Sequence, residues 1–148
     1  MKILVLGDVM GASGRNALNK KLPQIIKNNE IDFVIVNGEN SADDGKGITQ
    51  EIAEEFFKIG VDVITSGNHI WDKQETANYI NKENRLLRPA NLIEGSPGRG
   101  FGYISIAFVL LESFDEFINS KCFFHFEGLT KKIGSSKAAQ IPLMAPKV

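Results

Sequence analysis

The chain has 148 residues, of which 43% are hydrophobic and 24% charged, a composition typical of a globular domain and unlike that of disordered or collagen-like chains. Its formal net charge of −1, from 17 basic and 18 acidic residues, excludes a general electrostatic attraction to nucleic acid or to anionic membranes. Any phosphate chemistry must therefore depend on a local arrangement of side chains.

The cysteine content and the N-terminal residues indicate the compartment of the protein. Cys122 is the single cysteine, so we expect neither an internal disulfide nor a thiolate zinc site, which fits a reducing cytoplasm. The apolar run before Asp8 is too short for the core of a signal peptide or for a membrane span. We therefore expect a cytoplasmic protein with no membrane partner.

The first hundred residues repeat one pattern three times: an apolar run, then glycine with polar residues, then an amphipathic stretch. The apolar runs, which predict buried strands, are Ile3 to Leu6, Phe33 to Val36 and Val61 to Ile64. Near-continuous apolar strands that alternate with helices predict a layered α/β fold with a parallel sheet. The carboxyl ends of the strands then lie along one edge of the sheet, where ligands bind.

The first predicted helix lies between the first two strands. An apolar stripe with helical spacing supports it, and its members are Leu18, Leu22, Ile25 and Ile26. Pro23 lies within this stripe. Because proline disrupts the interior of a helix, we expect Pro23 to kink this helix or to shift its start.

Two further helices are predicted from their end signals. Thr49 is suited to be the N-cap of the second helix, and Gly60 to end it. Asp72 and Glu75 have the spacing of a capping box, which predicts a third helix that runs through Ile80.

The character of the chain changes after the third helix. Residues 84 to 102 are rich in glycine, proline and arginine, which predicts a long surface loop, and residues 101 to 111 are apolar enough for another strand. We therefore divide the chain into residues 1–102, the N-terminal half of a domain, and residues 103–148, a divergent C-terminal segment.

Each of the three predicted strands ends in a polar cluster that follows a glycine. The clusters are Asp8, Glu39 with Asn40, and Asn68 with His69. Carboxylate and amide oxygens are ligands suited to Mg²⁺, Mn²⁺ or Fe. Two such cations about 3.5–4 Å apart would clamp a phosphoryl group and hold a hydroxide for attack. His69 suits the role of general acid, because imidazole donates a proton near neutral pH.

Five short motifs stand out in the sequence, three of them at these strand ends and two within residues 84–102. They are Gly7-Asp8, Asn37-Gly38-Glu39-Asn40, Thr65-Ser66-Gly67-Asn68-His69-Ile70-Trp71-Asp72, Arg85-Leu86-Leu87-Arg88-Pro89-Ala90-Asn91 and Gly95-Ser96-Pro97-Gly98-Arg99-Gly100. The motifs closely resemble those of calcineurin-like metallophosphoesterases, and most of all those of the bacterial YmdB-like subfamily. The resemblance covers about residues 1–102.

The resemblance implies a metal-bearing α/β sandwich that hydrolyses phosphodiesters, so the partner would be a small phosphodiester, with 2′,3′-cyclic nucleotides as the substrate class. It implies Asp8, Glu39, Asn40 and Asn68 as ligands of two divalent cations, with Glu39 a candidate bridge. Mn²⁺ or Fe are the expected metals, and Mg²⁺ is the alternative. It also implies His69 as the general acid.

The second half of that family supplies three more histidine ligands, and this chain contains neither of their segments intact. Phe124-His125-Phe126-Glu127 matches one of them only faintly. Two alternatives therefore stay open: a truncated, inactive remnant of such an enzyme, and a metal-independent nucleotide-binding or phosphate-binding protein. An unpaired sheet edge would also favour a homo-oligomer.

Overall fold

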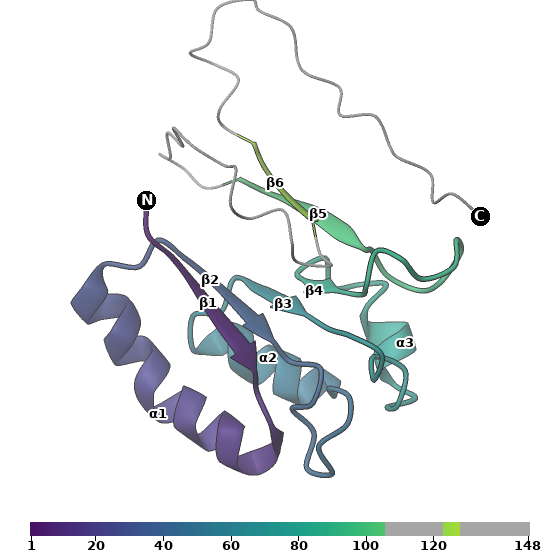
Figure 1. Cartoon of the computed structure of the whole chain (residues 1–148), viewed down its shortest axis with the longest axis horizontal. Helices are drawn as coiled ribbons and strands as arrows, with labels where there is room; N and C mark the ends of the chain where they lie inside the picture. The colour runs from purple at the N-terminus through teal and green to yellow at the C-terminus, as the bar shows by residue number, and fades with distance from the viewer. Residues whose placement is uncertain (106–122, 128–148) are drawn as a thin grey trace, which may run out of the picture.

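The computed structural model describes residues 1–105 and 123–127. Its centre is a parallel four-stranded sheet with the order β1-β2-β3-β4 (Figure 1). The strands are β1 (Ile3–Asp8), β2 (Phe33–Asn37), β3 (Val63–Thr65) and β4 (Leu86–Leu87). The helices between them are α1 (Gly11–Asn29), α2 (Gln50–Lys58) and α3 (Thr76–Tyr79). The predicted α/β fold with a parallel sheet is confirmed.

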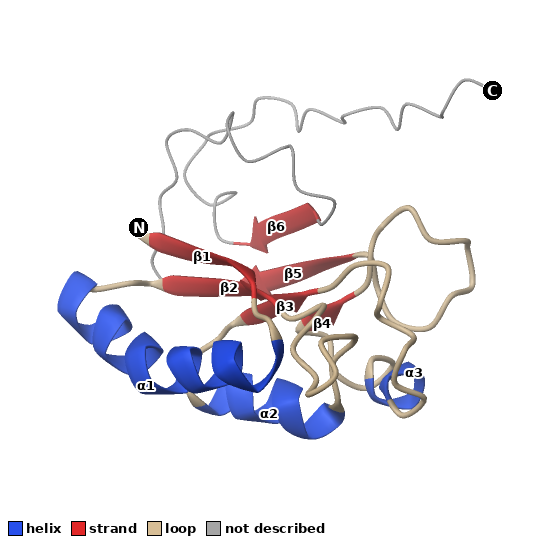
Figure 2. Cartoon of the chain, turned by 60° about the horizontal axis from the view of Figure 1, so that its bottom comes forward, coloured by secondary structure: helices blue, strands red, loops and turns tan. Residues whose placement is uncertain are grey.

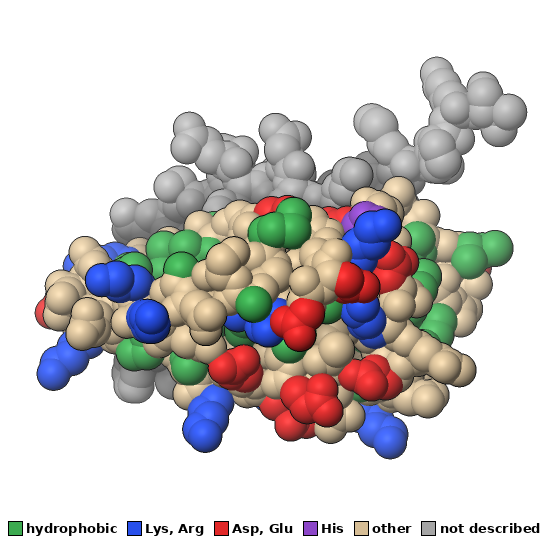
Figure 3. Space-filling model, turned by 90° about the horizontal axis from the view of Figure 1, so that it is seen from below, with side chains coloured by type: hydrophobic (Ala, Val, Ile, Leu, Met, Phe, Trp, Pro, Cys, Tyr) green, Lys and Arg blue, Asp and Glu red, His purple; other side chains and the backbone are tan. Residues whose placement is uncertain are grey.

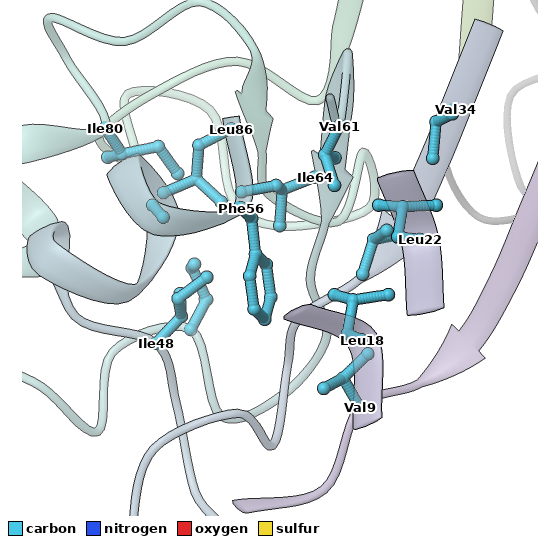
Figure 4. Packing of buried hydrophobic residues seen from close by; sticks show 13 residues of the cluster. Val9, Leu18, Leu22, Val34, Ile48, Phe56, Val61, Ile64, Ile80 and Leu86 are labelled. Carbon is cyan, nitrogen blue, oxygen red and sulfur yellow. The ribbon is translucent and has the colours of Figure 1, made fainter. Parts of the chain in front are cut away.

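Helices α1 and α2 cover one face of the sheet (Figure 2). Their apolar side chains join those of the strands in one large buried cluster (Figure 4). Phe56 of α2 is fully buried in this cluster, and Leu22 of α1 is 1% exposed. Burial of this apolar surface is the main favourable contribution to the stability of the fold.

The opposite face of the sheet is also apolar. Phe33 and Ile35 of β2 belong to a second buried cluster, whereas the alternate residues Val34 and Val36 belong to the helix-side cluster. Because successive side chains of a strand point to opposite faces, this alternation shows that β2 is buried on both faces. Ile104 packs against the second cluster.

Ile104 belongs to β5 (Phe101–Ser105), which pairs in parallel with β6 (Phe123–Glu127). The strand predicted from residue 101 is thus present as β5, and its expected continuation to residue 111 lies outside the described residues. Over the helix-covered face, acidic and basic side chains are interspersed (Figure 3). None of the helices in the described ranges combines the length and apolar character that crossing a bilayer requires.

The predicted ends of α2 are confirmed. The Thr49 hydroxyl accepts a hydrogen bond from the Ile52 amide at 3.3 Å. Gly60 follows the last turn with a φ of 103°, a left-handed conformation that glycine adopts without strain. The helix therefore begins and ends through local interactions of its own sequence.

The predictions about the other two helices have different outcomes, and the one about the start of α3 is wrong. Helix α1 runs from Gly11 to Asn29 with Pro23 inside it, so Pro23 does not shift its start, and a kink at Pro23 stays a prediction. Proline removes a single hydrogen bond, and the burial of Leu18 and Leu22 on the same helix offsets that loss. Asp72 does not start α3, which begins at Thr76, because the Asp72 carboxylate binds a side chain instead of a helix amide.

The predicted surface loop from residue 84 to 102 contains a short buried strand, which corrects that prediction. Leu86 and Leu87 form β4, pair with β3 and are each 1% exposed. A strand of two residues has no readable period, and its burial depends on the neighbouring strand.

Candidate active site

The three predicted polar clusters lie at neighbouring points of the sheet edge. Asp8 is the last residue of β1 and lies opposite Asn37, which ends β2. Asn37 in turn lies opposite Thr65, which ends β3. The segments that carry the candidate ligands therefore leave the sheet side by side, as expected for parallel strands.

Asn40 joins the end of β2 to the end of β1. Its side-chain nitrogen Nδ2 donates a hydrogen bond to Asp8 Oδ2 at 2.8 Å. Its carbonyl oxygen accepts a hydrogen bond from the Gly11 amide at 2.9 Å. The Asp8 carboxylate is exposed, so the bond from Asn40 orients a side chain that ligands can reach.

Glu39 joins the end of β2 to the end of β3. Its carboxylate lies directly against Gly67 and occupies the space that a Cβ at this position would take. The Glu39 amide donates to Asn37 Oδ1 at 2.9 Å, which sets the turn after β2. Since Gly67 immediately precedes Asn68, the structure places the Glu39 carboxylate beside the third polar cluster.

His69 forms a pair with Asp72, a residue that the sequence analysis assigned to a helix cap. The distance from His69 Nδ1 to Asp72 Oδ2 is 2.8 Å. With Nδ1 bound to the carboxylate, Nε2 is the ring atom that can exchange a proton with a ligand. The spacing of three residues between His69 and Asp72 was the available signal for this pair, because it also fits a turn. Asn68 is exposed beside His69.

The site residues contain donors of the kind that divalent cations prefer. Asp8 and Glu39 supply carboxylates, and Asn40 and Asn68 supply amide oxygens, which are hard ligands suited to Mg²⁺, Mn²⁺ or Fe. Within the described ranges, no three Asp, Glu, His or Cys side chains gather closely enough to hold a metal ion. The donor set therefore fits part of a metal site rather than a closed one.

A family model described as YmdB-like protein matches residues 4–139 of the chain. The chain belongs to the YmdB-like family. This match extends past residue 102, and the division of the chain at that residue stays a prediction.

Individual relatives support this membership. A 2′,3′-cyclic-nucleotide 2′-phosphodiesterase from Bacillus subtilis (strain 168) is 43% identical over 104 residues, which are 70% of this YmdB-like chain and 39% of that protein. A crystal structure described as a novel phosphatase from Mycoplasma pneumoniae has a TM-score of 0.63 and 33% identity, over 76% of this chain and 45% of that one.

A second solved structure shares the fold. A hypothetical protein from Thermus thermophilus matches with a TM-score of 0.62 and 33% identity, and the match covers 71% of this chain and 45% of the other. This YmdB-like chain thus spans less than half the length of each of these relatives.

Proposed function

We propose that this chain carries part of the active site of a metal-dependent phosphodiesterase that hydrolyses 2′,3′-cyclic nucleotides. The observation that carries the proposal is the contact of the Glu39 carboxylate with Gly67, because it brings an anionic oxygen pair between the second and third strand ends. The printed activity of the Bacillus subtilis relative supports the substrate class.

In this proposal Asp8, Glu39, Asn40 and Asn68 hold two divalent cations, Mn²⁺ or Fe with Mg²⁺ as the alternative. When bound, the cations supply Lewis-acid chemistry that polarises the phosphoryl group. The Asn40 amide orients the Asp8 carboxylate through its hydrogen bond. Glycine at position 67 leaves the space that the Glu39 carboxylate occupies.

His69 is proposed as the general acid. Water attacks phosphorus and releases a proton to the solvent, and the bond from phosphorus to the 2′ oxygen breaks. The departing oxygen takes a proton from Nε2 of His69, which regains a proton from the solvent. The product is a nucleoside 3′-phosphate. Asp72 orients the ring through its contact with Nδ1, which leaves Nε2 to donate the proton.

Purified full-length chain with Mn²⁺ or Fe²⁺ and 2′,3′-cyclic AMP tests the proposal. We expect His69→Ala to lower kcat by roughly 10²–10⁴-fold and to leave the Mn²⁺ affinity, measured by calorimetry, nearly unchanged. Glu39→Gln should weaken Mn²⁺ binding, whereas Glu51→Gln, an exposed carboxylate on α2, should change neither quantity.

Three results would contradict the proposed function or the proposed role of His69. Mn²⁺ binding without turnover under any divalent metal would support the inactive remnant. Nucleotide binding that needs no metal would support a nucleotide-binding protein. Turnover that His69→Ala leaves intact would remove His69 as the acid.

A further inference from the structure

Residues 41–48, here named the site loop, directly follow Asn40. The loop lies between the start of α1 and the segment that leads into α3 (Figures 1 and 2). Hydrogen bonds from the Ala42 amide to the Gly47 carbonyl, at 3.0 Å, and from the Gly45 amide to the Ala42 carbonyl, at 2.8 Å, close it into a tight turn. The loop is thus a compact unit, and its position affects the position of the adjacent Asn40.

Arg15 of α1 binds one side of the site loop. Its Nη1 donates to the Ser41 carbonyl at 2.5 Å, and its Nη2 lies 2.6 Å from the Asp43 carboxylate. The Arg15 side chain is only 17% exposed, which strengthens these charge-assisted bonds relative to bonds in open water. Because Ser41 follows Asn40 directly, Arg15 fixes the peptide next to a candidate metal ligand.

Lys73 binds the other side of the site loop. Its Nζ donates to Asp44 Oδ2 at 2.7 Å, and this bond holds the pKa of the Asp44 carboxyl below its ordinary value. The site loop also packs closely against the segment that contains His69. A Cβ added at Gly47 would lie 3.0 Å from the His69 carbonyl oxygen. The loop therefore touches the segment that carries the proposed acid.

We propose that Arg15 and Lys73 are positioning residues that clamp the site loop through Asp43 and Asp44, so that Asn40 stays against the Asp8 carboxylate. The inference rests on the proposed function and assigns a role to residues outside its ligand set. Ion pairs with exposed acidic partners contribute little to overall stability, so the effect is expected at the site rather than in Tm.

The first test removes the positively charged guanidinium group of Arg15. In metal-free, full-length protein we expect Arg15→Met to shift or broaden the NMR signals of the Asn40 side-chain amide, and to weaken Mn²⁺ binding by roughly tenfold, as for other groups that orient ligands. Lys21→Met, which removes an exposed cation from the same helix, is the matched control and should change neither. Unchanged Asn40 signals in Arg15→Met, with Mn²⁺ affinity within about twofold, would overturn the proposal.

The second test exchanges charges and does not depend on whether Arg15→Met folds. Lys73→Asp alone should perturb the Asn40 amide signals, and the double variant Lys73→Asp with Asp44→Lys should restore them. Failure of the exchange to restore a perturbed signal would overturn the role of the ion pair. If the wild-type chain binds no Mn²⁺, the proposed function fails for this chain, while the metal-free Asn40 signals still decide the positioning role.

Discussion

At the site, position 67 has the tightest steric constraint, because the Glu39 carboxylate lies directly against it. The carboxylate occupies the space in which any other residue at position 67 would place its Cβ. Asp8 is oriented in a different way, by a hydrogen bond from Asn40. One candidate ligand is therefore placed by steric fit and the other by a polar contact.

Gly67→Ala is expected to displace the Glu39 carboxylate, because the new methyl carbon would overlap Glu39 Oε2. We predict Mn²⁺ binding weaker by roughly tenfold or more, measured by calorimetry, with the fold retained. Gly7→Ala is the control, since a Cβ there meets nothing within 4 Å. Equal Mn²⁺ affinity in wild type and Gly67→Ala would contradict the proposed role of this contact.

Asp62 provides a prediction about pH. Its carboxylate accepts a hydrogen bond from the Val34 amide at 2.8 Å. Burial raises the pKa of Asp62, and the Val34 bond and the Arg85 charge oppose that rise. A raised pKa in the folded state means that the contribution of Asp62 to stability is full below its unfolded-state pKa and is lost as pH rises through the folded-state value.

Asp62→Asn keeps an acceptor for the Val34 amide and removes the titration. We therefore expect the free energy of unfolding of wild type, minus that of Asp62→Asn, to fall as pH rises from about 3 to about 6. Urea unfolding at a series of pH values measures this difference. The subtraction cancels the opposite trend from Glu83, whose pKa is lowered by its hydrogen bond with Arg85. A difference that rises with pH would show that burial does not dominate.

Helices α1 and α2 reach the same face of the sheet by different means. Helix α2 has local signals at both ends, with the Thr49 cap at its start and Gly60 after its last turn. Helix α1 has no side-chain hydrogen bond at its N-cap and contains Pro23. Its persistence depends on burial of Leu18 and Leu22 against the sheet.

Pro23→Ala should therefore stabilise the chain. The variant regains a backbone donor inside α1 and removes the clash of the proline ring with the preceding turn, so we predict a gain of about 1–3 kcal/mol in the free energy of unfolding. Urea unfolding measures it, and Gln24→Ala, at the next exposed position, should change stability by less than about 0.5 kcal/mol. A loss of stability in Pro23→Ala would show that α1 is adapted to the proline.

The hydrophobic core of the whole molecule extends to the base of the site. A Cβ on Gly38, which follows β2 directly, would lie 2.9 Å from the Ile48 side chain and 3.0 Å from that of Ile64. Phe56 belongs to the same cluster and is fully buried, with 0% of its surface accessible. The turn that carries Glu39 and Asn40 thus rests directly on packed side chains.

Phe56→Ala is predicted to lower the free energy of unfolding by about 3–5 kcal/mol, because it leaves a cavity in this cluster. Chemical denaturation monitored by circular dichroism measures the change. Ile93→Ala removes a side chain that is 81% exposed and should cost less than about 0.5 kcal/mol. A comparable loss in both variants would place the core elsewhere.

The sequence alone is enough to predict the parallel α/β order, the ends of α2 and the polar residues at three strand ends. These features depend on contacts between near neighbours in the chain, such as the Thr49 cap, or on the apolar period of single elements. For the same reason, the family motifs at Asp8, Glu39 and His69 are readable before any fold is known.

Tertiary structure decided the features whose partners are distant in sequence. Burial of β4 depends on β3, the continuity of α1 depends on the sheet beneath it, and the fit of Glu39 against Gly67 joins two strand ends. The local sequence allows Asp72 either to cap a helix or to pair with His69, and only the packed chain selects the pair with His69. Each outcome depends on close packing between separate segments, which the pattern of one segment does not encode.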